Sequence, residues 1–134
     1  MRKKPSERIT AIVIDDDYDL AQVVSEYLQM HGIRVLKIGH NGKDAYDLYK
    51  KCSPDLIITD LIMPEFDGYY GVSKIKGIDP DAKIIVITSD TDPTVSRRLS
   101  LLGVDGIVYK PINMSRLLSL TCRLCQRGLT KIER

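Results

Sequence analysis

The sequence lacks any apolar run approaching the ~18 residues that suggest a membrane span, and its start, from Met1 to Arg8, lacks the apolar stretch of a secretory signal. It has only three cysteines, Cys52, Cys122 and Cys125, without the spacing of a secreted disulfide framework. These absences predict a cytoplasmic protein with thiol cysteines and no membrane partner.

A strong excess of one charge is also absent. Twenty Lys and Arg residues against eighteen Asp and Glu residues give a net charge of +2, too small to imply a nucleic-acid partner through overall field. The length of 134 residues, with 43% hydrophobic and 28% charged residues, fits one globular domain. The C-terminal segment is locally basic, through Arg116, Arg123, Arg127, Lys131 and Arg134. A solvated face is the default interpretation of that segment, and a docking surface for an acidic partner is the alternative.

Short apolar runs rich in β-branched residues alternate with segments of helical periodicity. Strands are predicted near residues 9–14, 33–38, 56–59, 83–88 and 107–109, and helices near 20–31, 43–51, 68–76, 95–102 and 114–125. Five strand-helix units with short connections need right-handed crossovers onto a parallel sheet covered on both faces. The predicted fold class is therefore α/β, an open doubly wound sheet, since the chain is too short for an eight-fold barrel.

Four predicted strands end in side chains that carry chemistry. The first ends in Asp15-Asp16-Asp17, the third in Asp60, the fourth in Thr88-Ser89 and the fifth in Lys110-Pro111. In open α/β sheets, ligands bind outside these carboxyl ends. Carboxylates gathered there repel by about 4 kcal/mol per pair at ~4 Å and an effective dielectric of ~20, so we predict a cation site. Its hard oxygen ligands favour Mg²⁺, with Mn²⁺ as the alternative, over Zn²⁺.

The remaining side chains agree with phosphoryl transfer. Lys110 adds positive charge and Thr88 a hydroxyl beside the predicted metal, and phosphoryl transfer depends mainly on positioning and charge neutralisation. His31 and His40 are expected to lie away from the acidic strand ends. In the last helix, Met114, Leu117, Leu118, Thr121 and Cys125 are expected to face inward. Cys122 and Cys125 are then packing residues and not a redox or zinc motif.

These motifs, in this order, resemble the receiver domains of two-component response regulators, including single-domain chemotaxis regulators. The matching pieces are Asp15-Asp16-Asp17, the run Asp60-Leu-Ile-Met63-Pro64-Glu-Phe-Asp67-Gly68, Thr88-Ser89 and Lys110-Pro111. The resemblance implies a flavodoxin-like three-layer sandwich with five strands in the order 2-1-3-4-5. It covers roughly residues 8–127, which we predict to be the receiver domain, between a basic tail (1–7) and a C-terminal tail (128–134).

The resemblance also implies a role for each residue of the site. Asp60 would be the phosphoacceptor, taking a phosphoryl group from the phosphohistidine of a sensor histidine kinase or from a phosphotransfer protein. Asp16, Asp60 and the backbone carbonyl of Ile62 would bind Mg²⁺ directly, and Asp15 mainly through a bound water. Lys110 would contact the phosphoryl oxygens.

Residues around the phosphoacceptor would control switching and lifetime. By the same resemblance, Thr88 would swing toward the phosphoryl group, for which the small Ser89 leaves room. Ile62 and Asp90 occupy positions that tune phosphoryl lifetime, and the peptide bond from Lys110 to Pro111 would be cis. Ile107 departs from the family, which usually carries an aromatic residue three positions before the lysine. Thr88 and the loop after the fourth strand could still move in its place.

The implied function is a phosphorylation-dependent signalling switch that catalyses only its own phosphorylation and dephosphorylation. Its effector would be a protein bound to the face formed by the fourth helix, fifth strand and fifth helix, and it would be a monomer or a phosphorylation-dependent dimer, without direct nucleic-acid contact. Met1 favours a natural N-terminus, although a fragment of a longer regulator would look similar. Two alternatives are a phosphorylation-independent docking module, which Ile107 favours, and a small phosphatase resembling haloacid dehalogenases, whose signature Asp15-x-Asp17 superficially fits.

Overall fold

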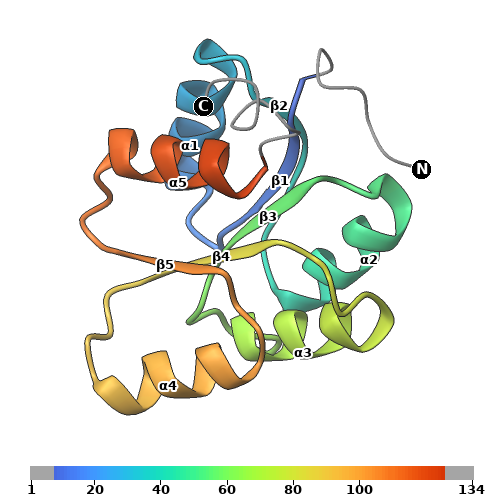
Figure 1. The fold of residues 1–134 in the computed structure, drawn as a ribbon, viewed down its shortest axis with the longest axis vertical. Helices are drawn as coiled ribbons and strands as arrows, with labels where there is room; N and C mark the ends of the chain where they lie inside the picture. Colours follow the sequence, from blue (N-terminus) through green and yellow to red (C-terminus); the bar gives the residue numbers. More distant parts are fainter. Residues whose placement is uncertain (1–7, 126–134) are drawn as a thin grey trace, which may run out of the picture.

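The computed structural model describes residues 8–125, which form a five-stranded sheet and five helices (Figure 1). The strands are β1 (Thr10–Ile14), β2 (Arg34–Gly39), β3 (Leu56–Asp60), β4 (Ile84–Thr88) and β5 (Gly106–Tyr109). The helices are α1 (Tyr18–Met30), α2 (Gly42–Cys52), α3 (Gly68–Ile78), α4 (Pro93–Leu101) and α5 (Met114–Leu124). Each element lies where the sequence predicts it, with small shifts at its ends.

The predicted tails, 1–7 and 128–134, and the last two residues of the predicted domain, 126–127, lie outside the described residues. Within residues 8–125, no helix combines the length and apolar character needed to cross a membrane.

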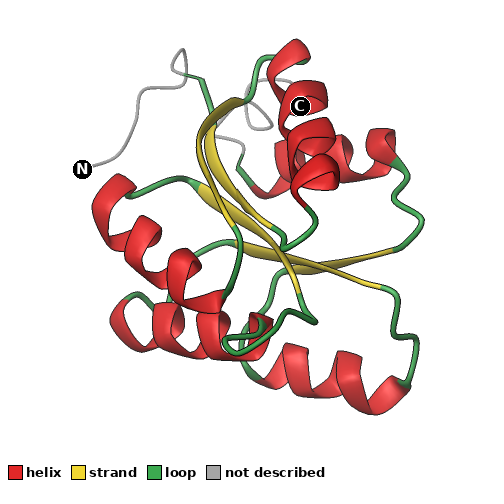
Figure 2. Cartoon of the chain, turned by 180° about the vertical axis from the view of Figure 1, so that it is seen from behind, coloured by secondary structure: helices red, strands yellow, loops and turns green. Residues whose placement is uncertain are grey.

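All neighbouring strands are parallel, and their order across the sheet is β2-β1-β3-β4-β5. The three inner strands are buried along their whole lengths, whereas β2 and β5 at the edges are partly exposed. Figure 2 shows the sheet as the middle layer between helices on both sides. This architecture confirms the predicted doubly wound, flavodoxin-like α/β fold.

Alternate residues of each strand enter two separate cores. In β1, Ala11 and Val13 join the core packed by α1 and α5, whereas Ile12 and Ile14 join the core packed by α2, α3 and α4. Figure 1 shows the same division of the helices between the two faces of the sheet. With both faces covered, polar side chains gather at the edges where the strands begin and end, and the carboxyl ends of the strands form one of these edges.

An Asp or Asn residue caps the N-terminus of each of these five helices. Its side chain accepts a hydrogen bond from a backbone N–H group in the first turn of the helix. These capping residues are Asp17, Asn41, Asp67, Asp92 and Asn113. After α1, the chain turns at Gly32, whose φ of 89° lies in the left-handed region that favours glycine. The last residue of the acidic run, Asp17, is therefore a helix cap: its Oδ1 accepts from the Leu20 N–H at 3.1 Å.

The inward face of α5 differs from the prediction in part. Leu117, Thr121 and Cys125 are buried as predicted, Met114 and Leu118 are partly buried, and Leu120, which the prediction omitted, is buried. Room for Leu120 comes from β5, because a Cβ atom on Gly106 would lie 2.6 Å from the Leu120 side chain. The missing side chain of Gly106 thus leaves room for Leu120 in the core beside Leu117.

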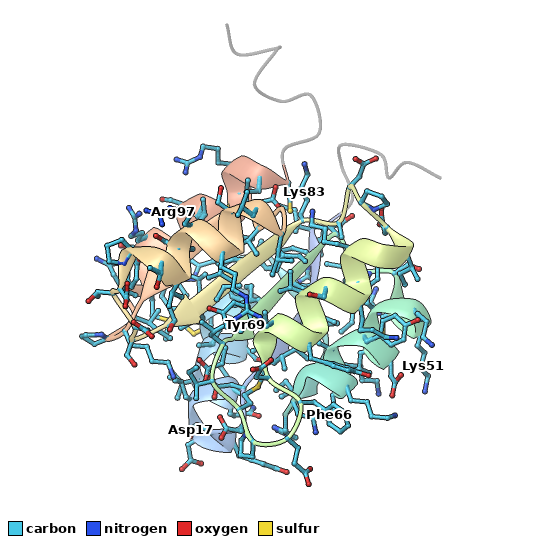
Figure 3. The ribbon with its side chains drawn as sticks, turned by 90° about the horizontal axis from the view of Figure 1, so that it is seen from below. Asp17, Lys51, Phe66, Tyr69, Lys83 and Arg97 are labelled. Carbon is cyan, nitrogen blue, oxygen red and sulfur yellow. The ribbon has the colours of Figure 1, made fainter. Side chains whose placement is uncertain are left out.

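Few buried side chains attach α4 to the rest of the molecule. Leu99 is fully buried, and Val95 and Leu102 pack partly buried around it. On the outside, the Arg98 guanidinium carbon lies 3.7 Å from the centroid of the Tyr69 ring. Tyr69 stands at the start of α3, next to α4 (Figure 3). A cation–π contact therefore joins α4 to α3.

Candidate functional site

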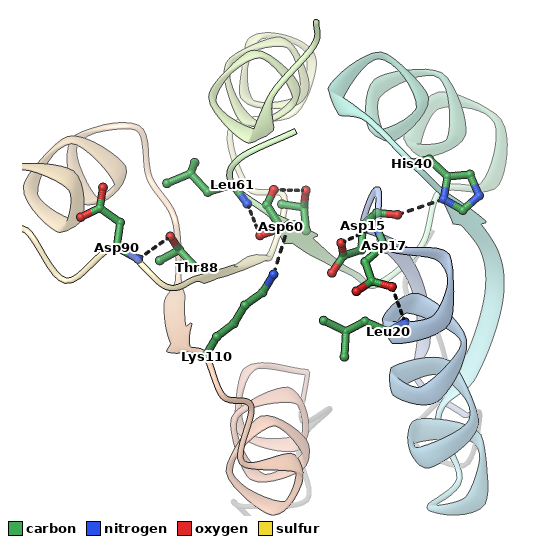
Figure 4. A network of polar contacts seen from close by, with 10 residues as sticks. Asp15, Asp17, Leu20, His40, Asp60, Leu61, Thr88, Asp90 and Lys110 are labelled. Carbon is green, nitrogen blue, oxygen red and sulfur yellow. Dashed lines mark hydrogen bonds and ion pairs between the residues drawn. The ribbon is translucent and has the colours of Figure 1, made fainter. Parts of the chain in front are cut away.

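Three carboxylates gather at the rim where β1 and β3 end. Asp15 follows β1, and Asp60 ends the neighbouring β3. Oxygens of Asp15, Asp16 and Asp60 all lie within 4.8 Å of one another. Asp15 and Asp60 are only 4% and 5% exposed, whereas Asp16 is exposed to solvent. The sequence correctly predicts this cluster, and Figure 4 shows its Asp15 and Asp60 members.

Lys110 reaches the cluster from the end of β5. Its Nζ lies 3.3 Å from Asp60 Oδ2, and Asp60 Oδ1 accepts a hydrogen bond from the Leu61 N–H at 2.9 Å. Both oxygens of this buried carboxylate therefore face positive or partly positive groups, which offset the cost of burying its charge. The peptide bond from Lys110 to Pro111 is cis, the geometry that the resemblance implies.

The buried carboxyl group of Asp15 ionises less readily than an ordinary aspartate. The pKa of this carboxyl is raised from 3.8 to about 6, chiefly by burial and further by repulsion from Asp60 and Asp16. The Asp17 N–H, which donates to Asp15 Oδ1 at 2.9 Å, and the Lys110 ammonium act in the opposite direction. A bound cation would offset the same repulsion and favour the ionised form of Asp15.

The donor set fits a hard divalent cation. The clustered ligand atoms are all carboxylate oxygens, the ligands that Mg²⁺ and Mn²⁺ prefer. Ile62 lies two residues after Asp60, in the loop that follows β3, and its side chain is 64% exposed. Coordination by its backbone carbonyl remains a prediction.

Thr88 ends β4 beside β5, where its carbonyl oxygen accepts from the Lys110 N–H at 2.9 Å. Its side chain is buried, and its Oγ1 accepts a hydrogen bond from the Asp90 N–H at 3.1 Å (Figure 4). Ser89 and Asp90 are exposed at the start of the loop to α4. The hydroxyl of Thr88 is thus bonded to that loop.

Ile107 lies in β5, paired in register with Val86 of β4, and packs partly buried against the core that contains α4. Tyr109, two residues later, is 41% exposed. The position that usually carries the switching aromatic residue therefore holds an aliphatic side chain inside the fold.

One prediction about the histidines is wrong. His31 lies at the far end of α1 as expected, but His40 Nδ1 is 2.9 Å from the carbonyl oxygen of Asp15, at the acidic rim (Figure 4). The predicted second strand stops at residue 38, whereas β2 continues to Gly39, which pairs with Ile14. A signal for this contact was available in the strand order, since the second strand lies next to the first.

Comparison with known proteins gives a consistent result. The sequence matches the response regulator receiver domain over residues 11–121. A relative, the chemotaxis protein CheY of Bacillus subtilis (strain 168), is 30% identical over 107 residues, which span 80% of this chain and 89% of that protein.

Two solved structures share the fold. The Francisella response regulator 1452 receiver domain has a TM-score of 0.83 at 22% identity, over 90% of this chain and 98% of that chain. A chain of the CheX-CheY-BeF₃-Mg²⁺ complex from Borrelia burgdorferi has a TM-score of 0.83 at 19% identity, over 87% and 88% of the two chains.

Proposed function

The chain belongs to the response regulator receiver domain family, and we propose that it accepts a phosphoryl group on Asp60 from a sensor histidine kinase or a phosphotransfer protein. One observation carries the proposal: the buried Asp60 carboxylate lies 3.3 Å from Lys110 and clusters with Asp15 and Asp16. A nucleophilic oxygen, a fixed positive charge and a set of metal ligands thereby share one rim of the sheet.

In the proposed reaction, a carboxylate oxygen of Asp60 forms a bond to phosphorus as the N–P bond of the donor phosphohistidine breaks. The leaving histidine nitrogen keeps the electron pair of that bond and takes up a proton, and the product is an aspartyl phosphate. Asp16, Asp60 and the backbone carbonyl of Ile62 would hold Mg²⁺ directly and Asp15 mainly through a water, and the ion would supply positive charge to the phosphoryl oxygens. Lys110 supplies a second positive charge from β5.

Thr88 would couple the phosphorylation of Asp60 to the loop after β4. Its Oγ1 accepts from the Asp90 N–H, so turning the hydroxyl toward a phosphoryl oxygen breaks a hydrogen bond to the loop that leads into α4. Ser89, next in the chain, is small enough to leave room for the phosphoryl group. The added charge then biases an existing equilibrium between two conformations and changes the affinity for a partner.

Receiver domains signal through histidine kinases and effector proteins, and we place the effector of this chain on the face made by α4, β5 and α5. Leu101 and Tyr109 are exposed on these elements. A protein of this fold in a complex of CheX, CheY, BeF₃ and Mg²⁺ supports a protein partner. We further propose a cytoplasmic location, no direct contact with nucleic acid or membrane, and a monomer or a phosphorylation-dependent dimer.

The two alternatives are not favoured. The phosphatase signature departs at Asp19 and gives no role to Asp60, which lies at the centre of the cluster beside Lys110. A phosphorylation-independent docking module gives no reason for the carboxylate cluster and the Lys110 contact to Asp60.

The test is the intact-protein mass after incubation with acetyl phosphate and Mg²⁺. Wild-type protein should gain one phosphoryl mass, and EDTA should suppress the gain. Asp60→Ala should gain nothing, whereas Asp17→Asn, which changes the helix cap, should be phosphorylated like the wild type. Failure of the wild type to gain mass with any divalent metal would contradict the proposal and favour the docking module.

A further inference from the structure

His40 lies directly after β2 and is held on three sides. Its backbone N–H donates to Asp44 Oδ2 at 2.8 Å, and its Nδ1 lies 2.9 Å from the Asp15 carbonyl oxygen. Its ring stacks on Tyr18 with the centroids 3.6 Å apart and the planes 8° from parallel. Because a carbonyl oxygen only accepts hydrogen bonds, Nδ1 carries the hydrogen in this contact. The contacts therefore fix both the orientation and the tautomer of the imidazole; Figure 4 shows the contact to Asp15.

The two ring contacts bracket Asp16. Asp15 precedes it and Tyr18, the first residue of α1, follows it, so one imidazole touches the chain on both sides of this acidic residue. The Asp15 N–H also donates to the Gly39 carbonyl at 3.0 Å, which ties Asp15 to the end of β2 through both of its backbone groups. The Asp16 side chain is exposed, so its direction depends on the backbone that carries it.

We propose that His40 is a positioning residue for the divalent-cation site: by donating from Nδ1 to the Asp15 carbonyl, it fixes the peptide group that joins Asp15 to Asp16. This inference rests on the proposed function, because it requires the acidic cluster to bind a cation. Mutating a residue that hydrogen-bonds to a metal ligand commonly lowers the affinity for the metal about 10- to 100-fold. Since His40 acts through a backbone carbonyl and not on a ligating atom, its loss should weaken binding by a smaller factor, about three- to tenfold.

His31 provides a matched comparison within the same chain. Its Nδ1 lies 2.9 Å from the Tyr27 carbonyl oxygen, and its ring contacts the Tyr27 ring at 4.4 Å. The same kinds of contact thus occur at the opposite end of α1 from the acidic cluster. Replacing His31 removes an imidazole, a hydrogen bond and a ring contact without touching the proposed cation site.

The experiment measures the affinity of the metal-free protein for Mn²⁺, from the electron paramagnetic resonance signal of free Mn²⁺, with Mg²⁺ as competitor. His40→Asn places an amide N–H where Nδ1 stands and should bind within about twofold of the wild type. His40→Gln places its amide near the position of Nε2, loses the bond to Asp15, and should bind three- to tenfold more weakly. His31→Gln should bind like the wild type. Thermal unfolding in EDTA accompanies each titration.

The outcomes separate this inference from the proposed function. If the wild type binds Mn²⁺ and the Asn and Gln variants of His40 bind it equally well, the positioning role is wrong. Equal affinity combined with a lowered unfolding temperature would show a purely structural role and would also overturn the inference. Failure of the wild type to bind either metal would instead overturn the proposed cation site, and the role of His40 with it.

Discussion

At the residue scale, the buried carboxylate of Asp15 makes the stability of the metal-free protein depend on pH. Its pKa is about 6 in the folded protein, above the ordinary value of 3.8 that applies to the unfolded chain. The folded state therefore holds this proton more tightly, and the stabilisation is complete below pH 3.8. It is lost as the pH rises through about 6, where Asp15 ionises inside the fold.

Asp15→Asn should therefore stabilise the metal-free protein at pH 7.5. The neutral amide avoids the buried charge and retains an oxygen to accept the Asp17 N–H. We expect a gain on the order of 1 kcal/mol, a few degrees in Tm, that shrinks below pH 6 and disappears near pH 4. Calorimetry in EDTA measures it. Asp19→Asn, at an exposed carboxylate in the first turn of α1, should give no gain, and an Asp15→Asn gain independent of pH would contradict the argument.

Ile62 should control how long the phosphoryl group persists. Its exposed apolar side chain, two residues after Asp60, offers no group to orient an attacking water. Ile62→Asn should shorten the lifetime of phosphorylated Asp60 by about three- to tenfold. The measurement follows the intact mass after acetyl phosphate is removed. Ile62→Val stays apolar and should keep the wild-type lifetime, and an Asn variant that dephosphorylates no faster would refute this role.

At the scale of elements, α4 is the helix with the fewest buried residues, so a single surface contact contributes a larger share of its packing. One fully buried leucine and the contact between Arg98 and Tyr69 hold it beside α3. A double-mutant cycle of Arg98→Ala and Tyr69→Leu should give a coupling free energy of about 0.5–1 kcal/mol in urea unfolding, as for exposed cation–π pairs. The neighbouring Arg97 is exposed, and Arg97→Ala should show no coupling to Tyr69→Leu. Equal coupling free energies for Arg97 and Arg98 would show that the contact between Arg98 and Tyr69 does not stabilise the protein.

The burial and packing of the elements explain how much of the fold and of the site could be predicted from the sequence. The inner strands are buried on both faces, so their apolar runs stand out, and the polar residues where they end, Asp15, Asp60 and Thr88, mark the rim. Periodicity did not add Leu120 to Leu117 in the core, because the room for Leu120 comes from Gly106 on β5, a contact between elements that the helix pattern does not contain. His40 was misplaced because the predicted second strand ended one residue early, although the implied strand order already placed that strand beside β1.

At the scale of the whole molecule, the proposed cation site would link cation binding to folding. Asp15, Asp16 and Asp60 come together only when β1 and β3 pair, so a cation that needs all three binds the folded chain. Such binding stabilises the fold by RT ln(1 + [L]/Kd), which is about 2.7 kcal/mol at a hundred times Kd. The proton on Asp15 would compete with that cation below pH 6, the raised pKa of this carboxyl.

Mg²⁺ should therefore raise Tm more at pH 8 than at pH 5. At pH 5, below the pKa of about 6, the cation must displace the Asp15 proton, whereas at pH 8 this carboxylate is already ionised. The measurement compares Tm against MgCl₂ concentration at the two pH values, with ionic strength held constant by KCl. Asp15→Asn should reduce the stabilisation and remove most of its pH dependence, because the competing proton is gone. Equal stabilisation of the wild type at both pH values would show that Asp15 does not share its proton site with the cation.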